Sequence, residues 1–360
     1  MTKNKVRAIA FYLPQFYPTP ENDKWWGPGF TEWTNVARAR PLFEGHYQPR
    51  LPGLLGFYDL RLPLVREQQV ELAAKAGIEG FCYWHYWFGN GKRLLDDVFR
   101  EVVESGKPDF PFCLCWANHS WYNKIWNPEV PDKLLIEQTY PGVKDFMEHF
   151  HEMLPAFKDR RYMRVNGKLL FGFFEPAGFD VALFMKIWDD LAKKHDLGGF
   201  HFFDFSYGMW NYNTINHRLF DSSVLDVLFD TFNNRTQKEF NKKRILTTKV
   251  RPLHIASYND YVQTAIKLFK QNPLVYPCII PGFDHSPRSG NRGHILYDST
   301  PELWGGLVRE IVEMLSYRPF EENLLFVKAW NEWGEGNYLE PDIKYGEKYL
   351  EELSKALKGQ

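Results

Sequence analysis

Apolar residues along the chain fall in short continuous runs, separated by longer segments in which they recur every three or four positions. A run without alternating polar residues is typical of a strand covered on both faces, as in a parallel sheet beneath helices. We predict eight strands, over 6–13, 78–87, 110–118, 168–176, 199–206, 252–258, 276–284 and 324–332. A further apolar run, at 224–229, competes with 252–258 for the sixth place.

The segments between these runs have the spacing of amphipathic helices. The first begins at Pro63, a residue favoured at the start of a helix, and ends at Gly77, a common C-terminal cap. The other helices are predicted over 94–105, 143–158, 180–195, 259–271, 301–316 and 344–358.

Eight strands that alternate with helices predict one α/β domain over residues 1–360, a single (β/α)8 TIM barrel. A doubly wound open sheet has the same alternation, but no glycine-rich phosphate loop joins a strand to a helix in this sequence.

The segment 14–59, hereafter the flap, is too long for an ordinary connection between a strand and a helix. We expect it, with other long βα loops, over the C-terminal face of the barrel, where active sites are built. It carries Trp25, Trp26 and Trp33, so it is either a structural cover or a sugar-binding wall.

The charge balance narrows the range of partners. Lys plus Arg is 44 and Asp plus Glu is 45, which gives a formal net charge of -1. We therefore expect neither nucleic acid nor an anionic membrane as the main partner. Aromatic residues make up 17% of the chain, and flat rings in its polar, glycine-bearing segments suit stacking on sugar faces.

The four cysteines lie in apolar runs, which predicts buried, reduced thiols rather than a disulfide scaffold or a metal site. The basic start is followed by an apolar run, but Pro14 and Gln15 interrupt it and no signal-peptide cleavage site follows. No apolar stretch approaches the ~20 residues of a membrane span. We therefore expect a soluble, cytoplasmic protein.

Polar residues follow several predicted strands at the point where each strand ends. A charged group at the C-terminal end of an apolar barrel strand usually serves function, because burial there requires a partner. Any one of these residues has an alternative role in structural hydrogen bonding. They are Trp116, Asn118 and His119 after the third strand, Glu175 after the fourth, Asp284 and Arg288 after the seventh, and Trp330, Asn331, Glu332, Trp333 and Glu335 after the eighth.

Glu332 and Glu335 are the most informative of these residues. They stand three positions apart in a turn framed by Gly334 and Gly336, so both side chains can point into one pocket. Two carboxyl groups among aromatic rings suit the cleavage of a glycosidic bond, in which one donates a proton and the other stays ionised. The alternative is an ordinary acidic turn.

Six stretches of the sequence together resemble one protein family. They are FYLPQFYPTPENDKWWGPGFTEWTNV, GHYQPRLPGLLGFYDLR, GFCYWHYWFGNGKRLL, CLCWANHSW, PGFDHSPR and AWNEWGEGNYLEPD, and they run from Ala10 to about Tyr345. On these motifs the chain is identified as a member of the WbsX family, which is often labelled as lipopolysaccharide or O-antigen biosynthesis protein. This family is similar to the endo-α-mannosidases of glycoside hydrolase family 99, which are (β/α)8 barrels.

The resemblance implies roles for the two glutamates. Family 99 enzymes carry a closing Asn-Glu-Trp-x-Glu-Gly stretch, whose glutamates fall on Glu332 and Glu335. Glu332 would take the proton of the substrate's own 2-hydroxyl, whose oxygen attacks the anomeric carbon and gives a 1,2-anhydro sugar. Glu335 would protonate the leaving oxygen and then activate water. This retaining reaction needs a 2-hydroxyl trans to the leaving group, as in α-mannose or α-rhamnose. It is expected to need no cofactor and no metal ion.

The same motifs and the strand ends supply the residues expected to contact the sugar. These are Tyr12, Trp26, Trp33, Tyr83, His85, Tyr86, Trp87, Trp116, Asn118, His119, Glu175, Asp284, Arg288, Trp330, Asn331 and Trp333.

One motif departs from the family pattern. The third-strand motif more often reads Trp-Ala-Asn-Glu, and here His119 takes the place of the glutamate, with Lys124 beyond it. Histidine both donates and accepts hydrogen bonds, which changes the expected substrate more than the reaction. Two other functions stay open: a glycosyltransferase or transglycosylase in surface-polysaccharide synthesis, and a non-catalytic carbohydrate-binding barrel.

Overall fold

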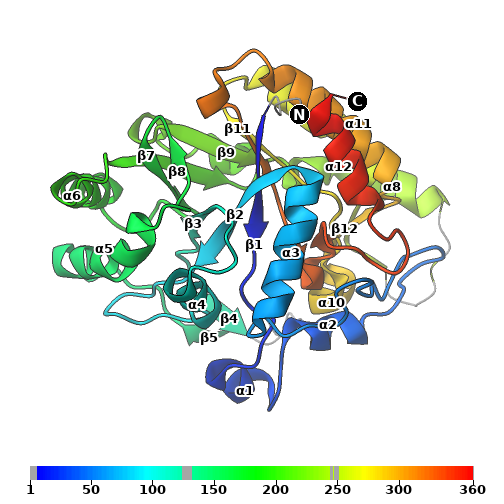
Figure 1. The fold of residues 1–360 in the computed structure, drawn as a ribbon. Coiled ribbons are helices and arrows are strands. Elements are labelled where there is room, and N and C mark those ends of the chain that lie inside the picture. Colours follow the sequence, from blue (N-terminus) through cyan, green and yellow to red (C-terminus); the bar gives the residue numbers. More distant parts are fainter. Residues whose placement is uncertain (1–5, 124–131, 244–245, 247–250, 360) are drawn as a thin grey trace.

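The structure, a computed structural model, describes residues 6–123, 132–243, 246 and 251–359. Lys124 therefore lies outside the described residues. Eight parallel strands close into a barrel in which β3 pairs with both β2 and β7, and β13 pairs with β1 (Figure 1). In order around the barrel the strands are β1 (Arg7–Tyr12), β2 (Ile78–His85), β3 (Phe112–Trp116), β7 (Lys168–Phe173), β8 (Phe200–Ser206), β9 (Ser222–Asp226), β11 (Tyr276–Ile279) and β13 (Leu324–Val327). The predicted (β/α)8 barrel is confirmed.

The sixth strand is β9, so the prediction of a barrel strand over 252–258 is wrong. Part of that segment forms β10 (His254–Ser257), which pairs with β12 (His294–Tyr297) in a separate two-stranded sheet. The physical reason is burial. Four of the five residues of β9 are buried, whereas Leu253 just before β10 is 53% exposed. A barrel strand beneath helices has no room for such exposure.

Among the described residues, seven helices pack outside the barrel close to their predicted ranges. They are α3 (Pro63–Ala76), α4 (Asp97–Ser105), α5 (Val143–Lys158), α6 (Val181–Lys194), α9 (Tyr258–Gln271), α11 (Pro301–Leu315) and α12 (Lys348–Lys358). The connection between β8 and β9 instead contains only α7 (Met209–Tyr212) and the 3-10 helix η1 (His217–Leu219). No described helix is both long and apolar enough to cross a membrane.

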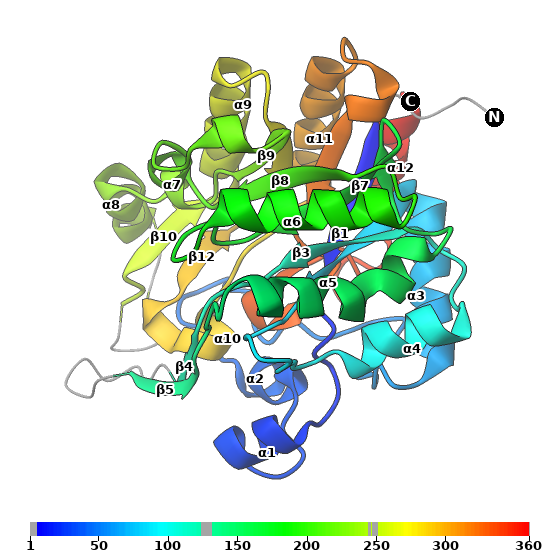
Figure 2. The ribbon, with the colours of Figure 1, turned by 90° about the vertical axis from the view of Figure 1, so that its left-hand side faces the viewer.

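The remaining elements are short and decorate the barrel. Figure 2 shows α1, α2, α10 and the β4–β5 hairpin together at one end. The short elements are α1 (Pro20–Trp26), α2 (Glu32–Arg38), β4 (Trp121–Asn123), β5 (Lys133–Ile136), β6 (Arg164–Val165), η2 (Phe229–Thr231), α8 (Asn234–Lys243), α10 (Ser286–Ser289), η3 (Gly290–Arg292), η4 (Phe320–Glu322), β14 (Asn331–Glu332), η5 (Trp333–Glu335) and β15 (Asn337–Tyr338).

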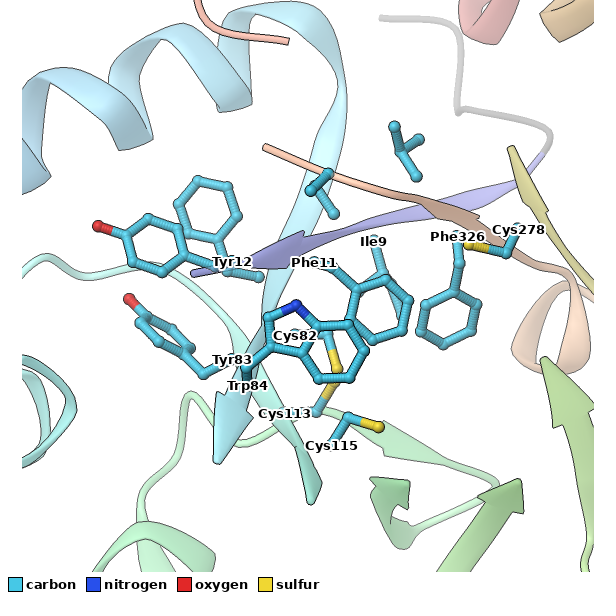
Figure 3. Close-up of a cluster of buried hydrophobic side chains, with 14 of the residues drawn as sticks. Ile9, Phe11, Tyr12, Cys82, Tyr83, Trp84, Cys113, Cys115, Cys278 and Phe326 are labelled. Atoms are coloured by element: carbon cyan, nitrogen blue, oxygen red, sulfur yellow. The ribbon is translucent and has the colours of Figure 1, made fainter. Parts of the chain in front are cut away.

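The strands are apolar on both faces, and their side chains alternate between the barrel interior and the helices (Figure 3). Phe11 of β1 and Trp84 of β2 stack at 4.5 Å, and both contact Phe205 across the barrel. Tyr12 and Tyr83 face the other way: the Tyr12 hydroxyl donates to Gln69 of α3 at 2.7 Å. The four cysteines are buried and free, as predicted.

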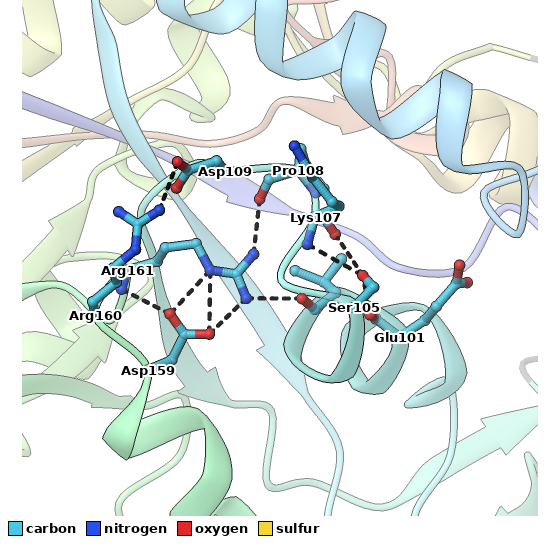
Figure 4. A network of polar contacts seen from close by, with 9 residues as sticks. Glu101, Ser105, Lys107, Pro108, Asp109, Asp159, Arg160 and Arg161 are labelled. Carbon is cyan, nitrogen blue, oxygen red and sulfur yellow. Dashed lines mark hydrogen bonds and ion pairs between the residues drawn. The ribbon is translucent and has the colours of Figure 1, made fainter.

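At the amino end of the barrel a buried arginine holds three segments together (Figure 4). Arg161 donates to the Pro108 carbonyl and to the Val102 carbonyl of α4, each at 2.8 Å, and forms an ion pair of 2.6 Å with Asp159. Because its guanidinium donors are satisfied by fixed backbone oxygens, Arg161 positions the start of β3 against α4.

The tight barrel interior predicts a difference between two glycines. A Cβ on Gly172 of β7 would lie 2.2 Å from the Phe203 ring, whereas one on Gly306 of α11 would have no atom within 4 Å. We expect Gly172→Ala to lower the free energy of unfolding by roughly 1–3 kcal/mol through overpacking. Gly306→Ala should raise it by up to about 1 kcal/mol, because alanine favours a helix. Urea denaturation compares the two, and equal midpoints would contradict the packing described here.

Candidate active site

The predicted glutamates lie together at the carboxyl end of the barrel. Glu332 ends β14 and Glu335 ends η5, both just after β13, and both line a cavity of about 440 Å³. The Trp84 indole N–H donates to Glu332 Oε1 at 2.9 Å. Gly336 ends the turn with φ of 54°, where a Cβ would press against Asp284 at 2.9 Å. The turn therefore needs glycine to present both carboxyls to one cavity.

Arg288 joins Glu335 to the flap. Its guanidinium forms ion pairs with Glu335 (2.6 Å) and with Glu32 of α2 (3.1 Å). Gly334 leaves the room for this contact, since a Cβ there would lie 2.1 Å from Glu32 Oε2. His285 Nε2 lies 3.9 Å from Glu335 Oε1 and adds a second basic group.

A buried lysine supplies a further positive charge. Lys328 follows β13, lines the same cavity and lies 3.5 Å from Asp226 of β9. Burial alone would lower the pKa of Lys328, but Asp226, Glu335 and Glu332 outweigh it and raise the pKa. Lys328 is therefore an ammonium ion within the barrel, beside the two glutamates.

These surroundings separate the acidities of the two carboxyls. Burial and the neighbouring Glu335 raise the pKa of Glu332 well above its usual value. Burial also disfavours the charge of Glu335, but Arg288, then Lys328 and His285, outweigh it and lower its pKa. These opposite shifts favour a protonated Glu332 beside an ionised Glu335. The roles implied by the family resemblance need the proton on Glu335 when the reaction starts.

Some of the predicted sugar-contacting residues line this cavity. They are Trp26, Tyr86, His119 and Arg288. The sequence reasoning missed other lining residues, which come from the flap, the β4–β5 hairpin and the strand ends. They include Gln15, Phe30, Glu32, Trp84, Trp121, Phe174 and Lys328. Trp25, which the sequence placed in the flap, and His285, at the end of the predicted seventh strand, line the cavity as well. The predicted flap is therefore partly a cavity wall.

Five other predicted residues do not line the cavity, because they occupy positions that face the helices. Tyr12 and Tyr83 pack against α3 and α4, through Gln69 and Phe99. The other three are His85, Trp87 and Trp116. His85 Nε2 lies 2.7 Å from His149 Nε2 of α5, and the Trp87 indole donates to Asp145 of the same helix. The Trp116 ring stacks on Phe184 of α6. Strand alternation would have kept Tyr86, added Trp84 and left out Tyr83 and His85.

Asp284 also lies outside the cavity, because it anchors the flap. It is fully buried and accepts hydrogen bonds from Gln48 Nε2 (2.6 Å) and the Ser286 backbone N–H (3.0 Å), and pairs with His46 Nε2 (2.7 Å). Burial opposes its charge, but His46 and Arg50 lower the pKa of Asp284 below its usual range. We assign it to holding the flap.

The other predicted residues outside the cavity hold loops in place or face solvent. Asn331 bonds both backbone groups of Leu13, and Asn118 bonds both backbone groups of Glu175, whose side chain is exposed. Trp33 donates to the Tyr58 carbonyl and packs 5.7 Å from Trp333, which itself donates to Glu340. Trp330 is buried against Phe81.

The sequence matches the family described as Glycosyltransferase WbsX over residues 8–353. The chain belongs to the WbsX family. It is 34% identical over 362 aligned residues to the WxcX proteins of two Xanthomonas campestris pv. campestris strains, B100 and ATCC 33913. The match covers 97% of this chain and 49% of each relative, so this WbsX chain spans about half the length of those relatives.

Two solved structures have the same fold as this WbsX protein. One is described as a glycoside hydrolase-like protein, with a TM-score of 0.61 and 13% identity over 99% of this chain and 95% of that one. The other is the family 99 endo-α-mannosidase of Bacteroides thetaiotaomicron in complex with bis-tris propane. It has a TM-score of 0.58 and 13% identity over 99% of this chain and 98% of that one.

Behind the site, Glu340 is expected to make stability depend on pH. It is buried and accepts hydrogen bonds from Tyr58, Gln69 and Trp333, and burial raises its pKa to about 7. Because the folded state binds this proton more tightly than the unfolded state, the contribution of Glu340 to stability is fully present below about pH 4.5. That contribution is lost as the pH rises from 4.5 through 7. In the unchanged protein the free energy of unfolding measured in urea should fall by about 2–4 kcal/mol between pH 4.5 and 8 because of this group. In Glu340→Gln this fall should be absent.

The control for this measurement is Glu104→Gln, a change on the exposed face of α4. It should leave the slope of stability against pH unchanged. A Glu340→Gln variant with the slope of the unchanged protein would contradict a buried, proton-binding Glu340.

Proposed function

We propose that this WbsX protein is a retaining α-glycoside hydrolase that acts on mannose- or rhamnose-type oligosaccharides or polysaccharides. The observation that carries the proposal is a pair of carboxyls that line one cavity walled by tryptophans, with surroundings that push their pKa values apart. Two carboxyls with separated pKa values are the usual equipment for general acid and base catalysis at a glycosidic bond. The family 99 fold of the Bacteroides endo-α-mannosidase supports the same class.

The proposed first step uses the substrate's own 2-hydroxyl. Glu332 takes the hydroxyl proton, the 2-oxygen attacks the anomeric carbon, and Glu335 gives its proton to the leaving oxygen. In the second step water attacks the 1,2-anhydro sugar, Glu335 takes a proton from the water, and the 2-oxygen regains its proton from Glu332. Two inversions leave the anomeric configuration unchanged, and the net reaction consumes one water.

The proton must change carboxyl before this chemistry starts. In the free site Glu332 carries it, and the two carboxyls share a hydrogen bond, so it has a direct path to Glu335. The starting state for catalysis therefore has the same number of protons as the free site. The Trp84 indole N–H at 2.9 Å stabilises the Glu332 anion that this transfer creates. We propose that the entering sugar drives the transfer.

The family's description as a glycosyltransferase favours a second candidate. In a transglycosylase the same pair would form the same intermediate, and a sugar hydroxyl would replace water in the second step. A screen of α-mannosides, α-rhamnosides and bacterial O-antigen fragments, with products identified by NMR, separates the two. Free reducing sugar supports the hydrolase, and lengthened chains support the transferase. Absence of both products across the screen would leave a non-catalytic binding barrel.

Substitution of each glutamate by glutamine tests the two roles. Loss of proton transfer typically costs 10²–10⁴-fold, so kcat/KM on a natural-type glycoside should fall by about that factor in Glu332→Gln and in Glu335→Gln. On an aryl glycoside with an activated leaving group, which needs little acid help, Glu335→Gln should recover much of its first-step rate. Glu332→Gln should stay slow. Pre-steady-state release of the aryl group measures this step.

The opposite pattern would reverse the roles, with Glu332 as the acid that already holds the proton. A 2-deoxy substrate lacks the internal nucleophile and should not react with any variant. Normal cleavage of that substrate, or a glycosyl ester trapped on either glutamate, would exclude participation of the 2-hydroxyl.

The proposed reaction requires no metal ion. Within the described residues, no group of three or more His, Cys, Asp or Glu side chains is arranged to hold one. We expect kcat/KM to be the same within error before and after dialysis against EDTA. Activity that is lost on chelation and returns with a divalent cation would favour a metal-dependent transferase instead.

A further inference from the structure

An exposed tryptophan stands beside the carboxyl end of β8. Trp210 belongs to α7, the short helix that follows β8 where a barrel helix is missing (Figure 2). Its side chain is 58% exposed. Because burying a tryptophan ring is strongly favourable, one left in solvent at the active end of a barrel points to a ligand.

The Trp210 ring is held on one side by its own loop. A Cβ on Gly208 would lie 3.1 Å from the indole, and Gly208 has φ of 135°, so a glycine lets the ring cover the backbone there. The Met209 N–H donates to Asp230 at 3.0 Å, which fixes the start of α7. Tyr207 packs its ring at 75° to the indole, with centroids 5.3 Å apart. The ring is thus oriented before any ligand arrives.

A row of ring contacts connects this tryptophan with the cavity that holds the two glutamates. Tyr207 is nearly parallel to Phe174, at 15° and 5.5 Å, and Phe174 lines the cavity. Phe174 in turn stacks on Phe205 inside the barrel at 5.6 Å. Trp210 is therefore outside the cavity and two ring contacts away from its wall.

We propose that Trp210 and Tyr207 form a distal sugar-binding platform, so that the substrate is a chain of several sugars that runs from the cavity over α7. This inference rests on the proposed function, because it takes the cavity as the place of cleavage. The platform binds one pyranose ring by stacking on the indole. It adds a binding site far from the reacting bond, which raises affinity for long chains over short ones.

Charge near the platform indicates the kind of sugar it takes. The exposed Glu175 carboxyl is close enough to Tyr207 to add to burial in raising the pKa of the phenol, and Asp230 lies beneath Gly208 at 3.5 Å from its Cβ position. Two carboxyls accept hydrogen bonds from sugar hydroxyls and repel sugar acids. The chain is therefore built of neutral sugars at this position. Glu175, predicted as a sugar contact, would serve here rather than in the cavity.

Binding to chains of increasing length tests the platform. The probes are linear α-mannose and α-rhamnose oligosaccharides from the disaccharide to the hexasaccharide, with affinity measured by calorimetry in a Glu335→Gln background that does not consume them. The affinity of this protein should rise with chain length. Trp210→Ala should weaken binding of the longest chain by about five- to tenfold, the size of one aromatic contact, and leave the disaccharide unchanged. Trp210→Phe should retain part of the gain.

Tyr317→Ala is the matched control, since Tyr317 is 86% exposed but lies between α11 and β13, at the opposite end of the barrel. It should bind every chain as the unchanged protein does. Equal affinity of Trp210→Ala and the unchanged protein for the hexasaccharide, or no gain with chain length, would overturn the platform. The test measures binding and not hydrolysis, so the two proposals can fail separately. If no glycoside is hydrolysed but Trp210→Ala still weakens binding of long chains, the proposed function is refuted and the platform is supported.

Discussion

The arrangement of the site depends on one partly buried cation, Arg288, shared by two carboxylates. Arg288 is paired with Glu335 of the closing turn and with Glu32 of the flap, 256 positions away in the sequence. Removing one partner of such an ion pair leaves an uncompensated charge, so the loss of any one of the three groups destabilises the arrangement of the other two. The same contact that fixes the flap also keeps Glu335 ionised. Arg288 thus contributes both to the position of the flap, together with Asp284, and to the low pKa of Glu335, together with Lys328 and His285.

This shared cation explains why so many aromatic and polar residues of the flap are not available to a sugar. Several flap residues point inward instead. Trp33 and Tyr58 pack toward the closing turn, and His46 and Gln48 bind Asp284, so these four hold in place the part of the flap that carries Glu32. The residues that remain for a ligand are those on the free side of the flap, Trp25, Trp26 and Phe30 among them. The flap thus supplies both the buried residues that hold it in place and part of the wall of the cavity.

The sequence was sufficient for the barrel, because continuous apolar runs and helical spacing are both strong signals. It was less informative inside the site. Where both faces of a strand are apolar, alternation is hidden, so the sequence pattern predicts Tyr83 and His85 together with Tyr86 and misses Trp84, which faces the cavity. Lys328 had a visible signal, a lone cation in the run LLFVKAW. Glu32 had none, since only the fold brings it to Arg288.

The site is assembled from the two ends of the chain. Leu13 is bonded to Asn331, His46 to Asp284 and Glu32 to Arg288, over sequence separations of 318, 238 and 256 residues. Contacts of such long range form late, after the loops that separate them have been closed. During synthesis the flap emerges before these partners, so its contacts with the closing turn form only after the eighth strand is made. A chain truncated before the eighth strand therefore lacks both glutamates of the closing turn and the contacts that hold the flap to that turn.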